Sequence, residues 1–137
     1  RAELKKRLSG KNWMLWDELD QLLDLGCAAN GQGGITIPWY FEQHIDKVDS
    51  MNGMLVTGEK VPLLSDPDAK GKPVRTISWD VVTLSSLKPD DPFQHVTTTD
   101  GAAGYIATDK LRSLLDYRLL ATRRNGKWSV VSLVSGD

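Results

Sequence analysis

The strongest constraint on the fold of this chain is a series of short apolar runs that starts at Met54. Each run spans only a few residues and is separated from the next by Pro, Gly or Asp residues that favour turns. No helical periodicity lies between the runs, so the sequence predicts the short strands of a small barrel or sandwich. The expected strands are Met54–Val56, Val61–Leu64, Val74–Ile77, Asp80–Leu84, Phe93–Thr98 and Gly104–Ala107.

The last part of the chain has the pattern of a β-hairpin. Two strand-like runs, Tyr117–Thr122 and Lys127–Val134, flank the linker Arg123–Gly126. The Asn125-Gly126 pair in this linker suits a type I′ turn, because such a turn needs a positive φ at both central positions. Apolar residues occur on both faces of the second run, so we expect the hairpin to be covered on both sides.

Residues 1–26 have the periodicity of a helix. Leu19, Leu22 and Gly26 recur at three- and four-residue spacing, which places them on one face. Gly26 also suits the end of the helix, where a left-handed residue is easiest for glycine. A shorter first helix is expected over Ala2–Leu8.

The composition is that of a globular domain, with 40% hydrophobic and 26% charged residues and a net charge of −1. No apolar run approaches the roughly 18 residues needed to span a bilayer. Basic residues are concentrated at 1–12 and 109–128, but they lack the interleaved aromatic residues of a nucleic-acid surface. We therefore expect no nucleic acid and no membrane span.

Catalytic and metal-binding candidates are few. Cys27 is the one cysteine, which rules out an intrachain disulfide, and a nucleophile–base pair would have to join it to His44 or His95. Cys27 follows the predicted helix, whose negative end disfavours a thiolate, so we interpret it as a small buried apolar residue. His95 is interpreted as a partly buried, hydrogen-bonded side chain. The acidic pairs at 66/68 and 90/91 lack the spacing of a calcium loop. We expect no enzyme, no metal and no cofactor.

One motif has a family resemblance. Residues 93–111 read Phe-Gln-His-Val, then an Asp-Gly turn, then Gly-Tyr-Ile-Ala and a short turn that ends in Leu. This stretch resembles the closing half of bacterial SH3 domains, and the resemblance extends over roughly residues 54–113. The stretch from Leu111 to Arg118, with Gly-Lys-Trp at 126–128, is similar to the tail of a group of uncharacterised bacterial SH3-domain-containing proteins.

The resemblance and the local patterns together predict an α+β fold. They predict a helical lead-in over residues 1–50, a small SH3-like β-barrel over residues 51–113, and a C-terminal β-hairpin over residues 114–137 packed on the rest. The chain begins without Met, so residues 1–50 are expected to be the end of an upstream region.

The same resemblance implies a non-catalytic binding module of the bacterial envelope, periplasmic or exported. Its expected partner is cell-wall peptidoglycan or an envelope protein. Ala107 and Lys110 stand where SH3 domains that bind proline-rich peptides have groove residues, and Phe93 stands in place of the usual barrel Trp, so a proline-rich partner is not expected. The alternative is an intramolecular accessory or interaction domain of a larger protein, with no external small ligand.

The predicted ligand-binding residues are Trp79, Asp80, Phe93 and Tyr105. Trp79 lies between two strand-like runs, where such barrels often have a Lys-Gly turn. Rigid aromatic residues with a few polar groups are typical of shallow binding sites. Packing of Trp79 against the N-terminal segment is the alternative interpretation, and the exposure of its ring separates the two.

Overall fold

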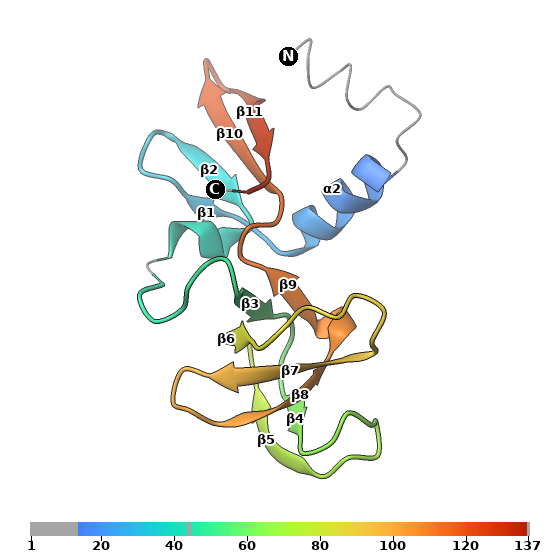
Figure 1. Cartoon of the computed structure of the whole chain (residues 1–137). Coiled ribbons are helices and arrows are strands. Elements are labelled where there is room, and N and C mark those ends of the chain that lie inside the picture. Colours follow the sequence, from blue (N-terminus) through green and yellow to red (C-terminus); the bar gives the residue numbers. More distant parts are fainter. Residues whose placement is uncertain (1–13, 44, 137) are drawn as a thin grey trace. The chain divides into compact units, whose positions relative to one another are not determined.

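The computed structural model describes residues 14–43 and 45–136, and it is mostly β, with 43% strand and 13% helix. The chain forms two compact units (Figure 1). The central unit consists of residues 45–115, and the terminal unit combines residues up to 44 with residues from 116 onward. Each unit has its own antiparallel sheet and its own apolar core.

The central unit contains a seven-stranded antiparallel sheet with the order β5-β4-β8-β7-β6-β3-β9. All six strands expected between Met54 and Ala107 are present, to within one or two residues at their ends. A further strand, β9, was not predicted, and it pairs with β3. The strands are β3 (Gly53–Val56), β4 (Val61–Leu64), β5 (Pro73–Ile77), β6 (Val81–Leu84), β7 (Phe93–Thr98), β8 (Ala103–Ala107) and β9 (Leu111–Ser113).

The predicted SH3-like barrel is wrong, because this sheet does not close. In the described part of the chain β5 pairs only with β4, and β9 pairs only with β3, so the two strands remain as separate edges. Closure of a barrel requires the two edge strands to hydrogen-bond to each other. Alternating apolar residues determine which face of a strand is buried, and they do not determine whether the edges of a sheet meet.

The core of the central unit lies on one face of this sheet. In β7 and β8 the residues alternate between buried and half-exposed, which is the pattern of a sheet with one covered face. Gly104 in β8 has no room for a side chain, since a Cβ there would lie 2.7 Å from the Leu64 carbonyl oxygen. The buried cluster consists of Val56, Val61, Leu63, Ile77, Val82, Leu84, Val96 and Ile106.

The terminal unit combines one α-helix, a 3-10 turn and a four-stranded antiparallel sheet with the order β1-β2-β10-β11. Leu22 from the helix is fully buried in its core, together with Ile37, Leu119, Ala121 and Leu133. The elements are α2 (Met14–Asp24), β1 (Ala28–Ala29), β2 (Gly34–Ile37), η1 (Trp39–Glu42), β10 (Arg118–Arg124) and β11 (Lys127–Val134).

The predicted α+β class, with a helical segment over residues 1–50, is also wrong. Of the described part of that segment only α2 is an α-helix, and β2 pairs with β10 about eighty residues later, with Ile37 opposite Leu119. Ile35 and Ile37 alternate with Thr36, and that local pattern became a strand because β10 offers a partner. The helix expected over Ala2–Leu8 lies outside the described residues.

The C-terminal hairpin is confirmed. β10 and β11 pair antiparallel, and Asn125 and Gly126 have φ values of 51° and 77°, as a type I′ turn requires. The expectation that both faces are covered is wrong, because Trp128 and Val131 of β11 are 53% and 63% exposed. No helix in the described residues is long and apolar enough to cross a membrane.

Candidate functional site

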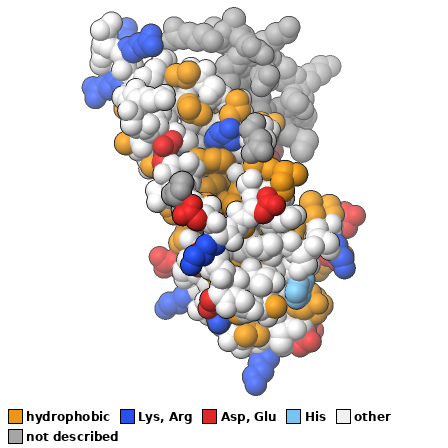
Figure 2. Space-filling model, turned by 60° about the vertical axis from the view of Figure 1, so that its left-hand side comes forward, with side chains coloured by type: hydrophobic (Ala, Val, Ile, Leu, Met, Phe, Trp, Pro, Cys, Tyr) orange, Lys and Arg blue, Asp and Glu red, His pale blue; other side chains and the backbone are white. Residues whose placement is uncertain are grey.

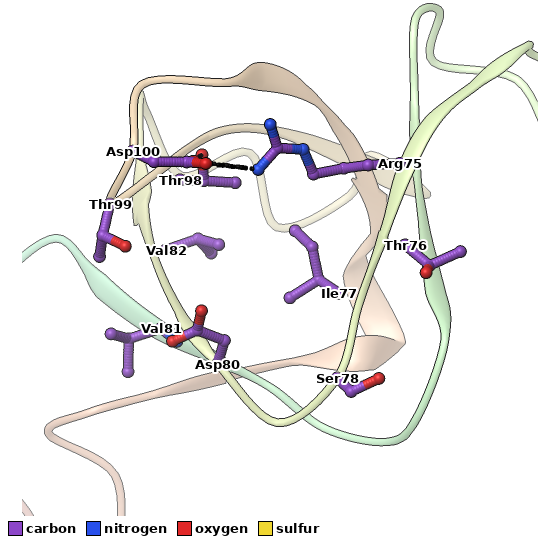
Figure 3. A pocket seen from close by; sticks show the side chains of 10 residues that line it. All are labelled: Arg75, Thr76, Ile77, Ser78, Asp80, Val81, Val82, Thr98, Thr99 and Asp100. Atoms are coloured by element: carbon purple, nitrogen blue, oxygen red, sulfur yellow. Dashed lines mark hydrogen bonds and ion pairs between the residues drawn. The ribbon is translucent and has the colours of Figure 1, made fainter.

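The candidate site is a cleft of about 260 Å³ on the central unit (Figure 3). Three short segments form it: the end of β5 with the following turn, the start of β6, and the turn after β7. Its walls are mostly polar and its deepest residues are apolar. The lining residues are Arg75, Thr76, Ile77, Ser78, Asp80, Val81, Val82, Thr98, Thr99 and Asp100.

The floor of the cleft is part of the core of the central unit. Ile77 and Val82 are 6% and 0% exposed, and both belong to the buried cluster. Figure 3 shows them between the Arg75–Asp100 pair on one side and Asp80 on the other. The cleft therefore combines a buried apolar floor with polar walls, and polar groups form most of its lining.

One wall is an ion pair between β5 and the turn after β7. Arg75 Nη1 donates to both carboxylate oxygens of Asp100, at 3.0 Å and 2.8 Å. The Thr98 hydroxyl donates a short hydrogen bond to the same carboxylate. The hydrogen bond from Arg75, and then that from Thr98, lower the pKa of Asp100 from 3.8 to about 2. Asp100 therefore keeps its charge to a lower pH than an aspartate with the ordinary pKa of 3.8.

The turn between β5 and β6 forms the opposite wall. Trp79 has a φ of 47°, which is rare for a bulky residue, and its backbone N–H donates to the Gly58 carbonyl at 3.0 Å. The next carbonyl, that of Asp80, accepts from the Val56 N–H at 2.9 Å. These two bonds hold the turn against the end of β3 and the residues that follow it, so that Ser78 and Asp80 lie at the cleft.

The Asp80 carboxylate uses one oxygen within the protein. Its Oδ1 accepts the Val81 N–H at 2.8 Å, and no described residue donates to Oδ2. Ser78 Oγ accepts the Lys60 N–H at 2.8 Å, which leaves its own proton to donate. Arg75 likewise uses one guanidinium nitrogen for Asp100 and has further N–H groups. The cleft thus offers both donors and acceptors to a ligand.

The structure does not bring the four predicted ligand-binding residues into one groove. Asp80 lines the cleft, whereas Trp79, the residue before it, is 38% exposed and is not part of the lining. Phe93 begins β7 at the end far from the cleft, five residues before Thr98. At about 3.3 Å per residue it lies roughly 17 Å along the strand.

Phe93 and Tyr105 form a second group, on the half-exposed outer face of the sheet. His95 pairs directly with Tyr105, with ring centroids 5.1 Å apart at an interplanar angle of 72°, and Phe93 shares the face because it lies two residues before His95. His95 Nδ1 also lies 2.6 Å from Ser85 Oγ. The prediction that His95 is half-buried and hydrogen-bonded is confirmed.

The other residues considered for catalysis or metal binding do not form a site in the described part of the chain. Cys27 is exposed, so its interpretation as a buried residue is wrong: it lies between α2 and β1, and no element within 14–43 or 45–136 covers it. Cys27 lies in the terminal unit and His95 in the central unit, and His44 lies outside the described residues. Within the described ranges, no three His, Cys, Asp or Glu side chains are grouped as metal ligands.

Sequence reasoning missed Arg75, Thr98 and Asp100 as site residues. Asp100 was identified only as part of an Asp-Gly turn, and Arg75 only as a residue of the expected strand Val74–Ile77. The exposed, cationic side chain of Arg75 in a strand was a weak signal, and nothing local pairs it with a residue 25 positions later. Comparisons of the chain with protein-family models, curated proteins and solved structures find no match.

Proposed function

We propose that the central unit is a non-catalytic binding module and that its cleft holds a small polar part of a larger ligand. The ligand class we propose is cell-wall glycopeptide, which makes the protein a periplasmic or exported component of a bacterial envelope. The observation that carries this proposal is the cleft itself, with Arg75, Asp80 and Asp100 around an apolar floor.

The polar groups of the cleft suit a ligand that has both donors and acceptors. Asp80 Oδ2 can accept from a ligand hydroxyl or ammonium, and the remaining N–H groups of Arg75 can donate to a carbonyl or carboxylate. Glycopeptides of the cell wall carry all of these groups. Ile77, which is 6% exposed, adds a small apolar surface at the floor against which part of a sugar ring can pack.

The size of the cleft limits what it can enclose. A volume of about 260 Å³ lies just below the roughly 300–1,000 Å³ of pockets that enclose drug-sized ligands. One sugar or a short peptide end is therefore the proposed occupant, with the rest of the ligand outside. Trp79 lies beside the cleft with 38% of its surface exposed, where it can contact that outer part.

The test is co-sedimentation of the full chain with purified peptidoglycan sacculi. The matched pair is Asp80→Asn, in the cleft, and Asp90→Asn, an exposed carboxylate in the loop before β7. We expect the wild type and Asp90→Asn to co-sediment equally. The affinity of Asp80→Asn for the sacculi should be at least about tenfold lower, because a charge-assisted hydrogen bond contributes roughly 1.5–3 kcal/mol.

Circular dichroism of each variant checks that the fold is intact. If the wild type stays in the supernatant at tens of micromolar protein, the glycopeptide proposal fails. If all three proteins bind alike, the cleft is not the site. The first result would favour an accessory role within a larger protein.

A further inference from the structure

The terminal unit has a long, open edge strand. β11 (Lys127–Val134) has eight residues and is the last strand of its sheet, so its outer backbone groups have no strand partner among the described residues. The opposite edge, β1, has only two residues. A long edge strand with unpaired N–H and C=O groups is a template for a further strand.

The face of β11 that continues the core becomes more exposed toward the hairpin tip. Leu133, Val130 and Trp128 share this face, opposite Leu119, Ala121 and Arg123, and they are 7%, 37% and 53% exposed. The core cluster covers Leu133 but extends no farther along the strand. The apolar stripe therefore continues onto a surface where an added strand can bury it.

A β-bulge limits the length over which an added strand can pair. Val131 is the extra residue, because Leu120 is opposite Ser132 while the next residue, Ala121, is opposite Val130. A bulge bends its strand and interrupts regular pairing. The regular part near the tip is thus Lys127–Val130, four residues long.

The charge of the hairpin is of one sign. Residues 118–134 include Arg118, Arg123, Arg124 and Lys127 and contain no Asp or Glu, and the last three are exposed. In Figure 2, Lys and Arg side chains gather at the upper end of the visible face, the level at which Figure 1 shows the tip of the β10–β11 hairpin. A strand added at Lys127–Val130 lies beside this cationic tip.

We propose that β11 binds a short, extended, acidic segment of a partner protein by strand addition along Lys127–Val130. Backbone hydrogen bonds to the open edge supply affinity that does not depend on the side chains of the segment. Apolar side chains at alternate positions of the segment pack on Trp128 and Val130, and the carboxylates between them lie on the other face, where they pair with Arg124 and Lys127.

Charge complementarity selects this occupant over two others. A second copy would bring a further hairpin with four basic residues and no acidic ones, so like charges would meet at the tip. Residues 1–12 of the chain itself carry five basic groups against Glu3, so they also have the wrong charge. An acidic segment satisfies the charge and needs only four residues of regular edge.

The probe is a labelled synthetic peptide that alternates Asp and Val, titrated with the full chain by fluorescence anisotropy. Two control peptides accompany it: one with Lys in place of Asp, and one with alternate backbone nitrogens methylated. We expect a Kd on the order of 0.1–1 mM for the acidic peptide, because the contact is much smaller than a standard interface of about 1,600 Å². Amide shifts in an NMR spectrum should be concentrated at residues 127–130.

The matched variants reverse two charges each. Arg124→Glu with Lys127→Glu, at the tip, should weaken binding of the acidic peptide about tenfold or more, since like charges then replace opposite ones. Lys70→Glu with Lys72→Glu, in the exposed loop before β5, should leave it unchanged. If the tip variant does not fold, Trp128→Ser provides the same comparison through the apolar stripe.

Three results would overturn the proposal. Equal binding of the acidic and Lys peptides removes the charge preference, and equal binding of the methylated peptide removes strand addition. Self-association of the peptide-free chain with shifts on β11 assigns the edge to a second copy instead. Asp80→Asn should bind the acidic peptide like the wild type, so failure here is distinguishable from failure of the cleft proposal.

Discussion

Arg75 Nη1 lies within 3.0 Å of both carboxylate oxygens of Asp100, although the two residues are 25 positions apart in the sequence. The pair connects β5 to the turn after β7, and it forms one wall of the cleft. Its side chains are 44% and 61% exposed, so water and salt weaken the attraction. Its main consequence is positional, because it holds the Arg75 guanidinium and the Asp100 carboxylate at the cleft.

The titration of Asp100 gives the first prediction. Its pKa of about 2 should appear as a low midpoint in carboxyl NMR shifts, and Arg75→Gln should move the midpoint up toward 3.8 because the strongest hydrogen bond is lost. A folded pKa below the unfolded value stabilises the fold above pH 3.8, and this contribution disappears as pH falls toward 2. Lys72→Gln, nearby and exposed, is the control, and a wild-type midpoint near 3.8 would contradict the prediction.

The backbone conformation of Trp79 gives the second prediction. Because its φ is 47°, Trp79→Gly should be more stable than Trp79→Ala by about 1 kcal/mol, since glycine adopts this conformation without a Cβ clash. Urea unfolding measures the difference. Thr76 is an exposed strand residue without a positive φ, so Thr76→Ala should be more stable than Thr76→Gly. If Ala equals Gly at 79, the left-handed turn is not retained in the variants.

The buried side chain of Gln94 gives the third. It is 2% exposed, accepts the Lys88 N–H at 3.1 Å, and donates to the Lys88 carbonyl at 2.6 Å. Gln94→Leu should cost about 1–3 kcal/mol, because the Lys88 backbone groups lose their partner. Hydrogen exchange of the Lys88 and Asp91 amides should become faster than in the wild type. Gln43→Leu, at an exposed position, should change neither the free energy of unfolding nor the exchange rates of these amides.

The exposure of Cys27 gives the fourth. The thiol should react completely with a disulfide reagent such as DTNB in the native protein, without denaturant, because it is solvent-accessible. Cys27→Ala should change the free energy of unfolding by less than about 0.5 kcal/mol, as is usual for surface positions. A thiol that reacts only after unfolding would contradict the position of Cys27 in the structure.

The strands between Met54 and Ala107 and the hairpin at Asn125-Gly126 could be predicted from the amino-acid sequence alone. Both depend on local patterns: alternating apolar residues bury one face of a strand, and particular residues suit a turn of given φ. Only the folded structure shows the sheet order, the separate edges at β5 and β9, and the pairing of β2 with β10. Alternation of apolar residues predicts which face of a strand is buried, but it does not predict which other strand pairs with it.

The same distinction applies to the cleft. Asp80 was predicted from its own neighbourhood, but its companions Arg75 and Asp100 come from other segments, and Phe93 and Tyr105 lie elsewhere on the sheet. A shallow site forms where strand ends and turns meet, and the register between strands determines which residues arrive there. That register depends on hydrogen bonds and packing between distant segments, which only the folded chain brings together.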